Sequence, residues 1–508
     1  MTGERRRLRF RRFATRLERA LDGGGAVRRR RRPGVCAALD RCGLSAYYVP
    51  AEYGGELTDY TELHQALRMV ARRDPGVALA HGRTFHAVAP VWVSDDAVAA
   101  HRVGRLVVGG TRIASSLAVP GMGPEPHTGV SAYPVVGGYR VDGEEWVGDD
   151  LAPGSYVSLL SRTSPVATPR AHSLLLLRPD SLPGRGGPSG SRRLAFCDTR
   201  VGADALVGGE GRGAEIVLKA RQLGWAAGSA LPLGAAEHAL RERLAGSRPP
   251  QTRRFAEAYA DLLLCEALSL VAVRSVHLLP GELSVTSAVV GLLVPELTGA
   301  AALAEDAHLC REVLAAQFRS LVRGHRSPHD HRPQLDRLFG AAEAVVPFAP
   351  ERIGLFSRHG SAVLGTLPLS VRRLRHLARA APEFGVAAGH AERLLEVTDT
   401  LHQRLPGPAV TGDPGLGRGY ALCFAGAVCA GLWLGGGPAV GDGPDGLWRD
   451  GLWLEACLTR VLAHLGVRPP SGADGALFDR LATVMIRQYE DGRPFSLLPF
   501  PMAEGEPR

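Results

Sequence analysis

Hydrophobic positions recur at near-helical spacing along the first hundred residues of the chain. Four of them lie in an arginine-rich segment: Leu8, Phe13, Leu17 and Leu21. Their spacing predicts an amphipathic helix. Asp59 and Glu62 have the spacing of a capping box and predict the start of a second helix. A third helix is predicted over residues 78–93, with a break near Pro90, which lacks a backbone N–H.

Between residues 105 and 212 the pattern changes to short apolar runs rich in Val, Leu and Tyr, separated by glycine turns. Runs of this kind predict β-strands. We expect strands at residues 105–108, 113–119, 131–136, 139–141, 156–160 and 173–177. Gly137 and Gly138 lie between two of these runs and predict a hairpin. The segment is therefore expected to form a small antiparallel β-domain or barrel.

Helical periodicity returns after residue 213. We expect helices at residues 214–244, with a kink at Pro232, and at 255–279, 300–322, 371–381, 389–405, 420–434 and 447–465. The predicted fold class is α+β, mainly α. It comprises an N-terminal helical domain (1–104), a central antiparallel β-domain (105–212), a C-terminal helical bundle (213–325) and an additional helical region (334–508).

The net charge of +9 is a reason to consider nucleic-acid binding. Lys219 is, however, the only lysine among 60 Lys and Arg residues, which is typical of a GC-rich genome rather than of selection for phosphate contacts. No aromatic residues alternate with the arginines, as a stacking surface for bases requires. We therefore expect no nucleic-acid partner.

The eight cysteines are scattered without a CxxC spacing, and we find no secretory signal and no apolar segment of membrane-spanning length. These observations predict a cytoplasmic protein without a membrane partner. Four polar residues between two prolines or beside them lack the spacing of a helical metal site, so we expect no metal: His325, His329, Asp330 and His331. The glycine cluster at residues 415–419 follows no predicted strand, which excludes a dinucleotide fingerprint there.

Two motifs in the N-terminal half carry a resemblance to a known family. Residues 48–55 read YVPAEYGG and residues 71–82 read ARRDPGVALAHG, so a double glycine is followed by a helix that ends in Arg-Asp-Pro. Residues 208–213 (GGEGRG) and 243–249 (RLAGSRP) continue the pattern. In this order the chain resembles the acyl-CoA dehydrogenases over residues 35–325. The resemblance implies an FAD-dependent oxidoreductase that desaturates acyl thioesters.

The resemblance also implies which residues hold FAD. Residues 143–150 (GEEWVGDD) are similar to the family's Gly-Glu-Lys-Trp element, in which Trp146 would stack on the flavin ring. Ser116 lies where the family has a hydroxyl at the polar end of the ring, although the family's Glu-Pro and Gly-Ser-Asp pairs are missing here. Arg243 matches the arginine by which one subunit reaches the flavin of its neighbour.

The family's catalytic base is a carboxylate that takes the acidic α-proton of the substrate. The stretch in which this base lies is shorter in the present chain, and the aligned place contains Glu305 and Asp306. The resemblance assigns Glu305 as the base and leaves Asp306 as the alternative, although neither is followed by the family's glycine. By the same resemblance, Arg221 lies near the acyl pocket.

These matches and gaps lead to two hypotheses. The first is a flavoprotein that oxidises an acyl thioester, carried by CoA or by an acyl carrier protein, at its α and β carbons. The second is a catalytically silent homologue that serves as a structural or regulatory subunit. We expect a homo- or hetero-oligomer, because the shortened bundle is predicted to leave Leu262, Leu263 and Leu270 uncovered.

Overall fold

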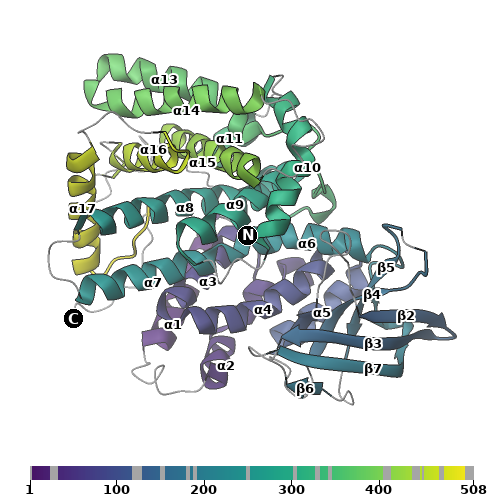
Figure 1. The fold of residues 1–508 in the computed structure, drawn as a ribbon. Coiled ribbons are helices and arrows are strands. Elements are labelled where there is room, and N and C mark those ends of the chain that lie inside the picture. Colours follow the sequence, from purple (N-terminus) through teal and green to yellow (C-terminus); the bar gives the residue numbers. More distant parts are fainter. Residues whose placement is uncertain are drawn as a thin grey trace.

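The computed structural model describes residues 3–22, 32–116, 129–148, 155–166, 168–178, 184–186, 191–246, 252–300, 306–326, 332–340, 346–403, 414–436, 447–448, 451–467 and 474–497. Helices make up most of the molecule, and one β-sheet lies beside them, at the lower right in Figure 1. Helices, strands and further helices follow one another along the chain, so the predicted α+β, mainly α class is confirmed.

Five helices precede the sheet: α1 (Gly3–Asp22), α2 (Arg32–Cys42), α3 (Tyr60–Arg73), α4 (Pro75–Trp92) and α5 (Ala97–Val108). Three of them, α3, α4 and α5, begin after an aspartate that caps the helix. The predicted start at Asp59 is confirmed, because its carboxylate accepts a hydrogen bond from the Thr61 N–H of α3 at 2.8 Å. The Glu62 carboxylate lies 3.3 Å from the Arg6 guanidinium of α1, so it forms an ion pair that joins α3 to α1.

Two boundaries in this part differ from the prediction. Residues 105–108, predicted as a strand, form the last turn of α5, which begins after Asp96. Val103 and Val107 lie on the buried face of α5, so this β-branched run belongs to a helical stripe. Pro90 does not break α4 where predicted but lies inside its last turn.

The strands of the described chain form one eight-stranded sheet. They are β1 (Ile113–Ser116), β2 (Val130–Val135), β3 (Gly138–Gly148), β4 (Tyr156–Arg162), β5 (His172–Leu177), β6 (Gly184–Gly186), β7 (Ser191–Gly202) and β8 (Leu206–Val207). Their order is β6-β7-β3-β2-β4-β5-β8, with β1 paired to β4. Most pairings are antiparallel, as predicted, but β4 pairs in parallel with β1 and β2, so the sheet is mixed. The predicted hairpin is confirmed, because Val135 pairs with Gly138 and Gly137 turns the chain with a φ of 84°.

The bundle that follows the sheet consists of α6 (Gly213–Gly228), α7 (Ala230–Gly246), α8 (Thr252–Leu278), α9 (Leu283–Leu297) and α10 (Ala307–Arg326). The helix predicted over residues 214–244 is two helices, because the chain breaks at Ser229. Pro232 then lies in the first turn of α7. Backbone N–H groups in a first turn have no acceptor within the helix, so a proline there breaks no helical hydrogen bond. The prediction missed α9, because this helix is apolar on nearly every side and shows no helical periodicity.

Seven further helices complete the described chain: α11 (Arg332–Phe339), α12 (Ala362–Gly365), α13 (Leu367–Ala380), α14 (Gly385–Gln403), α15 (Pro414–Gly436), α16 (Leu452–His464) and α17 (Asp474–Glu490). α15, α16 and α17 pack against α8 of the bundle (Figure 1). The α8 side chains Leu262, Leu263 and Leu270 are buried, with 2%, 0% and 8% of their surface exposed. The predicted uncovered face is therefore wrong, because helices of the same chain cover it.

α15 corrects the expectation that no apolar segment reaches membrane-spanning length. Its residues Gly415–Gly436 form a helix that is long and apolar enough to cross a membrane by length and composition. Within the fold, however, 83% of its apolar window is buried, and α15 contacts α8, α9, α10 and α14. α15 is therefore packed as a core helix.

Residues 493–497, which we call the C-terminal clasp, close over a group of buried charges. Arg68 of α3 lies between Glu237 of α7 and Glu266 of α8. The Phe495 carbonyl accepts a hydrogen bond from Arg68 at 2.8 Å, and the Phe495 N–H donates to Glu237 at 3.2 Å. The backbone N–H two residues further on donates to Glu266 at 2.6 Å. The clasp thus completes the hydrogen bonding of charges that burial would otherwise leave short of partners.

Candidate functional site

A partly exposed carboxylate lies where α6 meets the start of α10. Asp306 immediately precedes α10, and its carboxylate accepts hydrogen bonds from the Arg221 guanidinium and, at 2.9 Å, from the Trp225 indole N–H. Arg221 and Trp225 are four residues apart, so they lie on the same face of α6. We call these three residues the α6–α10 site. It joins segments that are 85 residues apart in the sequence.

Glycines make room around the α6–α10 site. A Cβ at Gly291 of α9 would lie 2.7 Å from the Cys310 sulfur and 3.2 Å from the Trp225 ring, so a larger residue would push these groups apart. A Cβ at Gly224 of α6 would lie 2.9 Å from Nδ1 of His86 on α4. His86 is exposed, so an imidazole stands beside the helix that carries the site.

The structure distributes the other predicted site residues over separate elements. Arg221 contacts Asp306, the predicted alternative base, whereas Glu305 lies outside the described residues. Arg243 lies exposed in the last turn of α7. The roles of Glu305 and Arg243 therefore remain predictions.

Trp146 presents an indole on β3 with 46% of its surface exposed. The Arg193 guanidinium of the neighbouring strand β7 lies 5.9 Å from the centre of this ring and also pairs with Glu144. Ser116 ends β1, a strand that contacts β3. An exposed indole beside a guanidinium fits a planar, phosphate-bearing cofactor, because the ring can stack and the cation can bind phosphate. These donors therefore fit FAD, although Glu144 offsets part of the positive charge.

The two motifs that carry the family resemblance meet in a buried polar cluster. The Tyr48 hydroxyl lies 2.6 Å from Nδ1 of His81, and Nε2 of the same ring lies 3.1 Å from the Asp40 carboxylate. Arg112, which precedes β1, donates to Asp40 at 2.7 Å. Burial raises the pKa of Tyr48, so the phenol stays protonated. Because Tyr48 and His81 are fully buried, the cluster ties the helices to the sheet rather than facing a substrate.

Sequence reasoning missed Trp225 and His86. The signal that could have found them is the spacing of Gly224 and Gly228, because glycines one turn apart let a neighbouring helix and its side chains approach closely. No comparable signal marks the pairing of Asp306 with α6.

The histidines at the end of α10 and after it were considered above as metal ligands. His325, at the end of α10, lies with Nε2 3.1 Å from the Asp399 carboxylate of α14. His329, Asp330 and His331 lie outside the described residues. Among the residues that the structure describes, no three His, Cys, Asp or Glu side chains gather in a metal-binding group.

Comparisons with known proteins identify the fold. No family model and no curated protein matches the chain. An acyl-CoA dehydrogenase from Bacillus anthracis, complexed with FAD, is 15% identical with a TM-score of 0.56, and the match covers 97% of this chain and 95% of that chain. The FAD complex of PigA is 17% identical with a TM-score of 0.50, covering 60% of this chain and 87% of that one. The likeness to the Bacillus structure extends into the C-terminal helices, beyond the residues that carry the sequence resemblance.

Proposed function

We propose that this chain, which has the acyl-CoA dehydrogenase fold, is an FAD-dependent oxidoreductase. Its substrate would be an acyl thioester, carried by CoA or by an acyl carrier protein, and the reaction would remove hydrogen from the α and β carbons. The supporting observation is the fold likeness, across 97% of the chain, to a structure that contains FAD. An oligomer belongs to this proposal, because Arg243 would reach the flavin of a neighbouring subunit.

The reaction needs a carboxylate on one side of the acyl chain and a hydride acceptor on the other. When bound, FAD supplies that acceptor. Glu305 is proposed to take the α-proton, because both carboxylate oxygens of the neighbouring Asp306 already accept hydrogen bonds, from Arg221 and Trp225. Arg221 would then act as a positioning residue that holds the start of α10 beside the substrate.

Trp146, Ser116 and Arg243 are proposed to hold FAD. Arg193 lies over one face of the Trp146 indole, which leaves the other face for stacking on the flavin ring. Ser116 would lie at the polar edge of that ring. In this proposal, Ser116 of β1 and Trp146 of β3 bind the cofactor from two strands that contact each other.

The visible spectrum of the purified protein tests the proposed function. Flavin absorption bands, and their bleaching by an acyl thioester under anaerobic conditions, are the expected result. A colourless protein that also fails to take up added FAD would exclude this reaction. Bands that no acyl-CoA and no acyl carrier protein bleaches would separate cofactor binding from the proposed substrate.

Replacing Trp146 with alanine is expected to weaken FAD binding about fivefold. The change removes a stacking contact of about 1 kcal/mol without altering the backbone hydrogen bonds of β3. Titration of the apoprotein with FAD, followed by flavin fluorescence, measures the affinity.

Two further variants show whether this loss is specific. Trp146→Phe keeps an aromatic surface and should retain most of the affinity. Val136→Ala alters the fully exposed tip of the β2–β3 hairpin and should leave the affinity unchanged. Equal affinities for the wild-type and Trp146→Ala proteins would show that this indole is only a hairpin residue.

Two observations favour the silent homologue as the second candidate. Donors on α6 occupy both oxygens of Asp306, and the glycine that follows the base in the family is missing after Glu305. A silent subunit should bind a partner protein without bleaching any flavin. Turnover of a single acyl thioester by the purified chain would eliminate this candidate.

A further inference from the structure

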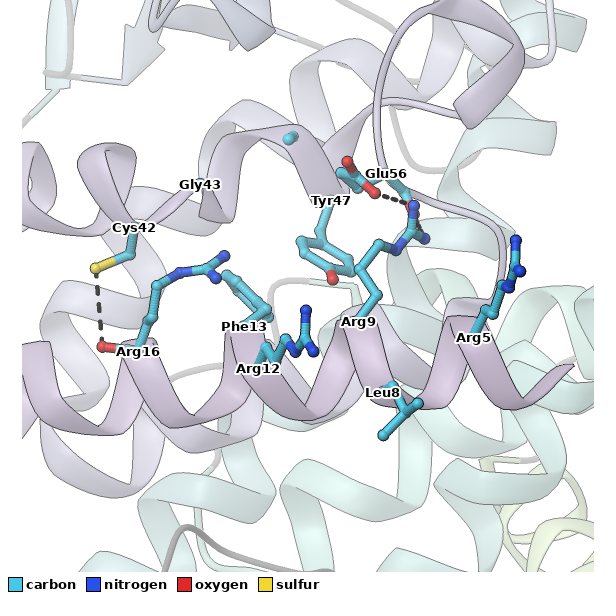
Figure 2. Close-up of a pocket in the computed structure, with 11 residues that line it drawn as sticks. Arg5, Leu8, Arg9, Arg12, Phe13, Arg16, Cys42, Gly43, Tyr47 and Glu56 are labelled. Atoms are coloured by element: carbon cyan, nitrogen blue, oxygen red, sulfur yellow. Dashed lines mark hydrogen bonds and ion pairs between the residues drawn. The ribbon is translucent and has the colours of Figure 1, made fainter. Parts of the chain in front are cut away.

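α1 borders a pocket that the proposed function does not use. A cavity of about 530 Å³ opens between α1 and the short helical turn η1 (Leu44–Tyr48), as Figure 2 shows. Four arginines of α1 line it: Arg5, Arg9, Arg12 and Arg16. Their spacing of three or four residues places them along one face of the helix. The volume lies within the range of small-molecule binding sites.

The charges of this arginine pocket are not balanced. Glu56 is the single acidic residue among those that line it, and Arg9 pairs with this carboxylate (Figure 2). Within the described part of the chain, no carboxylate pairs with the other three lining arginines, Arg5, Arg12 and Arg16. Like charges at this spacing repel one another on a helix. The pocket therefore concentrates positive charge that the residues described by the structure leave without a counterion.

Arg6, on another face of α1, has carboxylate partners within the protein. Arg6 pairs with Asp59 at 3.2 Å and with Glu62 at 3.3 Å. The chain thus supplies two acidic partners between α1 and α3. The described residues supply no equivalent partners in the arginine pocket, which leaves its positive charge available to an anionic ligand.

The floor of the pocket is apolar. The rings of Phe13 and Tyr47 are buried and their centroids lie 4.3 Å apart. Leu8 lines the pocket with 47% of its surface exposed. Burial, with a contribution from nearby Glu62, raises the pKa of Tyr47, so its hydroxyl remains a hydrogen-bond donor. Because both rings are buried, the apolar surface open to a ligand comes from Leu8, Gly43 and Ala46. A cationic wall beside such surface suits a ligand that has both an apolar part and several negative charges.

We propose that the arginine pocket binds a small organic polyphosphate of the nucleoside diphosphate class. Guanidinium groups bind phosphate oxygens through paired hydrogen bonds, and Arg12 and Arg16 lie about one helical turn apart, which suits two contacts to one diphosphate. The base of the ligand would lie against Gly43 and Ala46, which line the pocket and are partly exposed. This inference does not rest on the proposed oxidoreductase activity.

Calorimetric titration of the full-length protein with ADP tests this binding. We expect saturable binding that weakens as salt is added, and an affinity loss of at least tenfold for each of Arg12→Gln and Arg16→Gln. Arg11→Gln is the matched control, because it removes the same charge from an exposed position of α1 outside the pocket. Its affinity should stay within twofold of the wild type. Circular dichroism confirms that the variants are folded.

Further titrations separate this pocket from other anion sites. ADP should bind equally well to the Trp146→Ala protein, whereas pyrophosphate and adenosine should each bind more weakly than ADP. The proposal is overturned by an absence of saturable ADP binding, or by an equal loss in Arg11→Gln or Trp146→Ala. It is also overturned if pyrophosphate binds as tightly as ADP, or if a glutamate-rich peptide binds and ADP does not, since α1 would then be a protein-docking surface.

Discussion

Replacing Arg68 with methionine is expected to lower the free energy of unfolding by about 3–5 kcal/mol. Arg68 is 7% exposed and donates hydrogen bonds to Glu237, Glu266 and the Phe495 carbonyl. Within the described chain, it is the cation that pairs with Glu266. The variant would therefore bury a carboxylate without its counter-charge, which is a costly defect in a protein interior. Urea denaturation followed by circular dichroism measures the loss.

Arg375→Met is the matched control for this prediction. Arg375 pairs with Glu392 at 2.6 Å, but both side chains are exposed, so this change should cost at most about 1 kcal/mol. Equal losses for the Arg68 and Arg375 variants would contradict the role given to the buried network. The double variant Arg68→Met, Glu266→Gln should be more stable than Arg68→Met alone, because it removes the charge that the single change leaves unpaired.

The pH of this comparison matters. Although burial alone would raise it, the pKa of Glu237 is lowered from its ordinary value of 4.5, because Arg68, Arg72 and Arg241 surround the carboxylate. A lowered pKa means that the folded state releases the proton more readily than the unfolded state. The stability from Glu237 is thus present above pH 4.5 and is lost as the pH falls below it. Neutral pH is therefore the condition at which the Arg68 variant should show its full effect.

Replacing Glu305 with glutamine is expected to slow flavin reduction by an acyl thioester about a hundredfold or more. A general base must accept the α-proton as the bond breaks, and an amide cannot do so. Anaerobic stopped-flow measurement of flavin bleaching follows this step directly. FAD affinity and the circular dichroism spectrum should not change, since the substitution removes only a charge.

Asp306→Asn serves as the paired variant. Because its carboxylate is held by Arg221 and Trp225, this change should loosen the start of α10 and slow the reaction less than tenfold. The opposite ranking, with Asp306→Asn the slower enzyme, would make Asp306 the base. Arg221 would then be the group that adjusts the proton affinity of this carboxylate. If neither variant of an active enzyme is slowed, the base lies elsewhere in the chain.

The sequence predicts those elements whose signals are local. The Asp59 cap, the hairpin at Gly137 and the long α8 were all expected, because a cap, a tight turn and an amphipathic period each depend on neighbouring residues. α9 was missed because a helix that is apolar on nearly every side has no period to detect. Residues 105–108 predict a strand, because β-branched side chains are favoured there, but they complete the buried stripe of α5 and are therefore helical.

The candidate site depends on contacts that no local pattern contains. Arg221 was expected near the acyl pocket by resemblance, but its pairing with Asp306 links residues 85 positions apart. The cover over Leu262 and Leu270 likewise comes from helices far along the chain, so a surface predicted for a second subunit proved to be interior. Tertiary packing thus determines whether these residues are exposed or buried, even where their local structure was predicted correctly.

Because of the C-terminal clasp, folding of the bundle depends on a segment that is synthesised long after the first helices. Arg68 and Phe495 are 427 residues apart, so α3 leaves the ribosome long before the segment that completes its hydrogen bonds. Contacts of such long sequence separation form late. The bundle therefore reaches its native state only after residue 497 has been synthesised. A chain that terminates before residue 493 would expose two carboxylates meant for burial, and we expect cellular proteases to remove it.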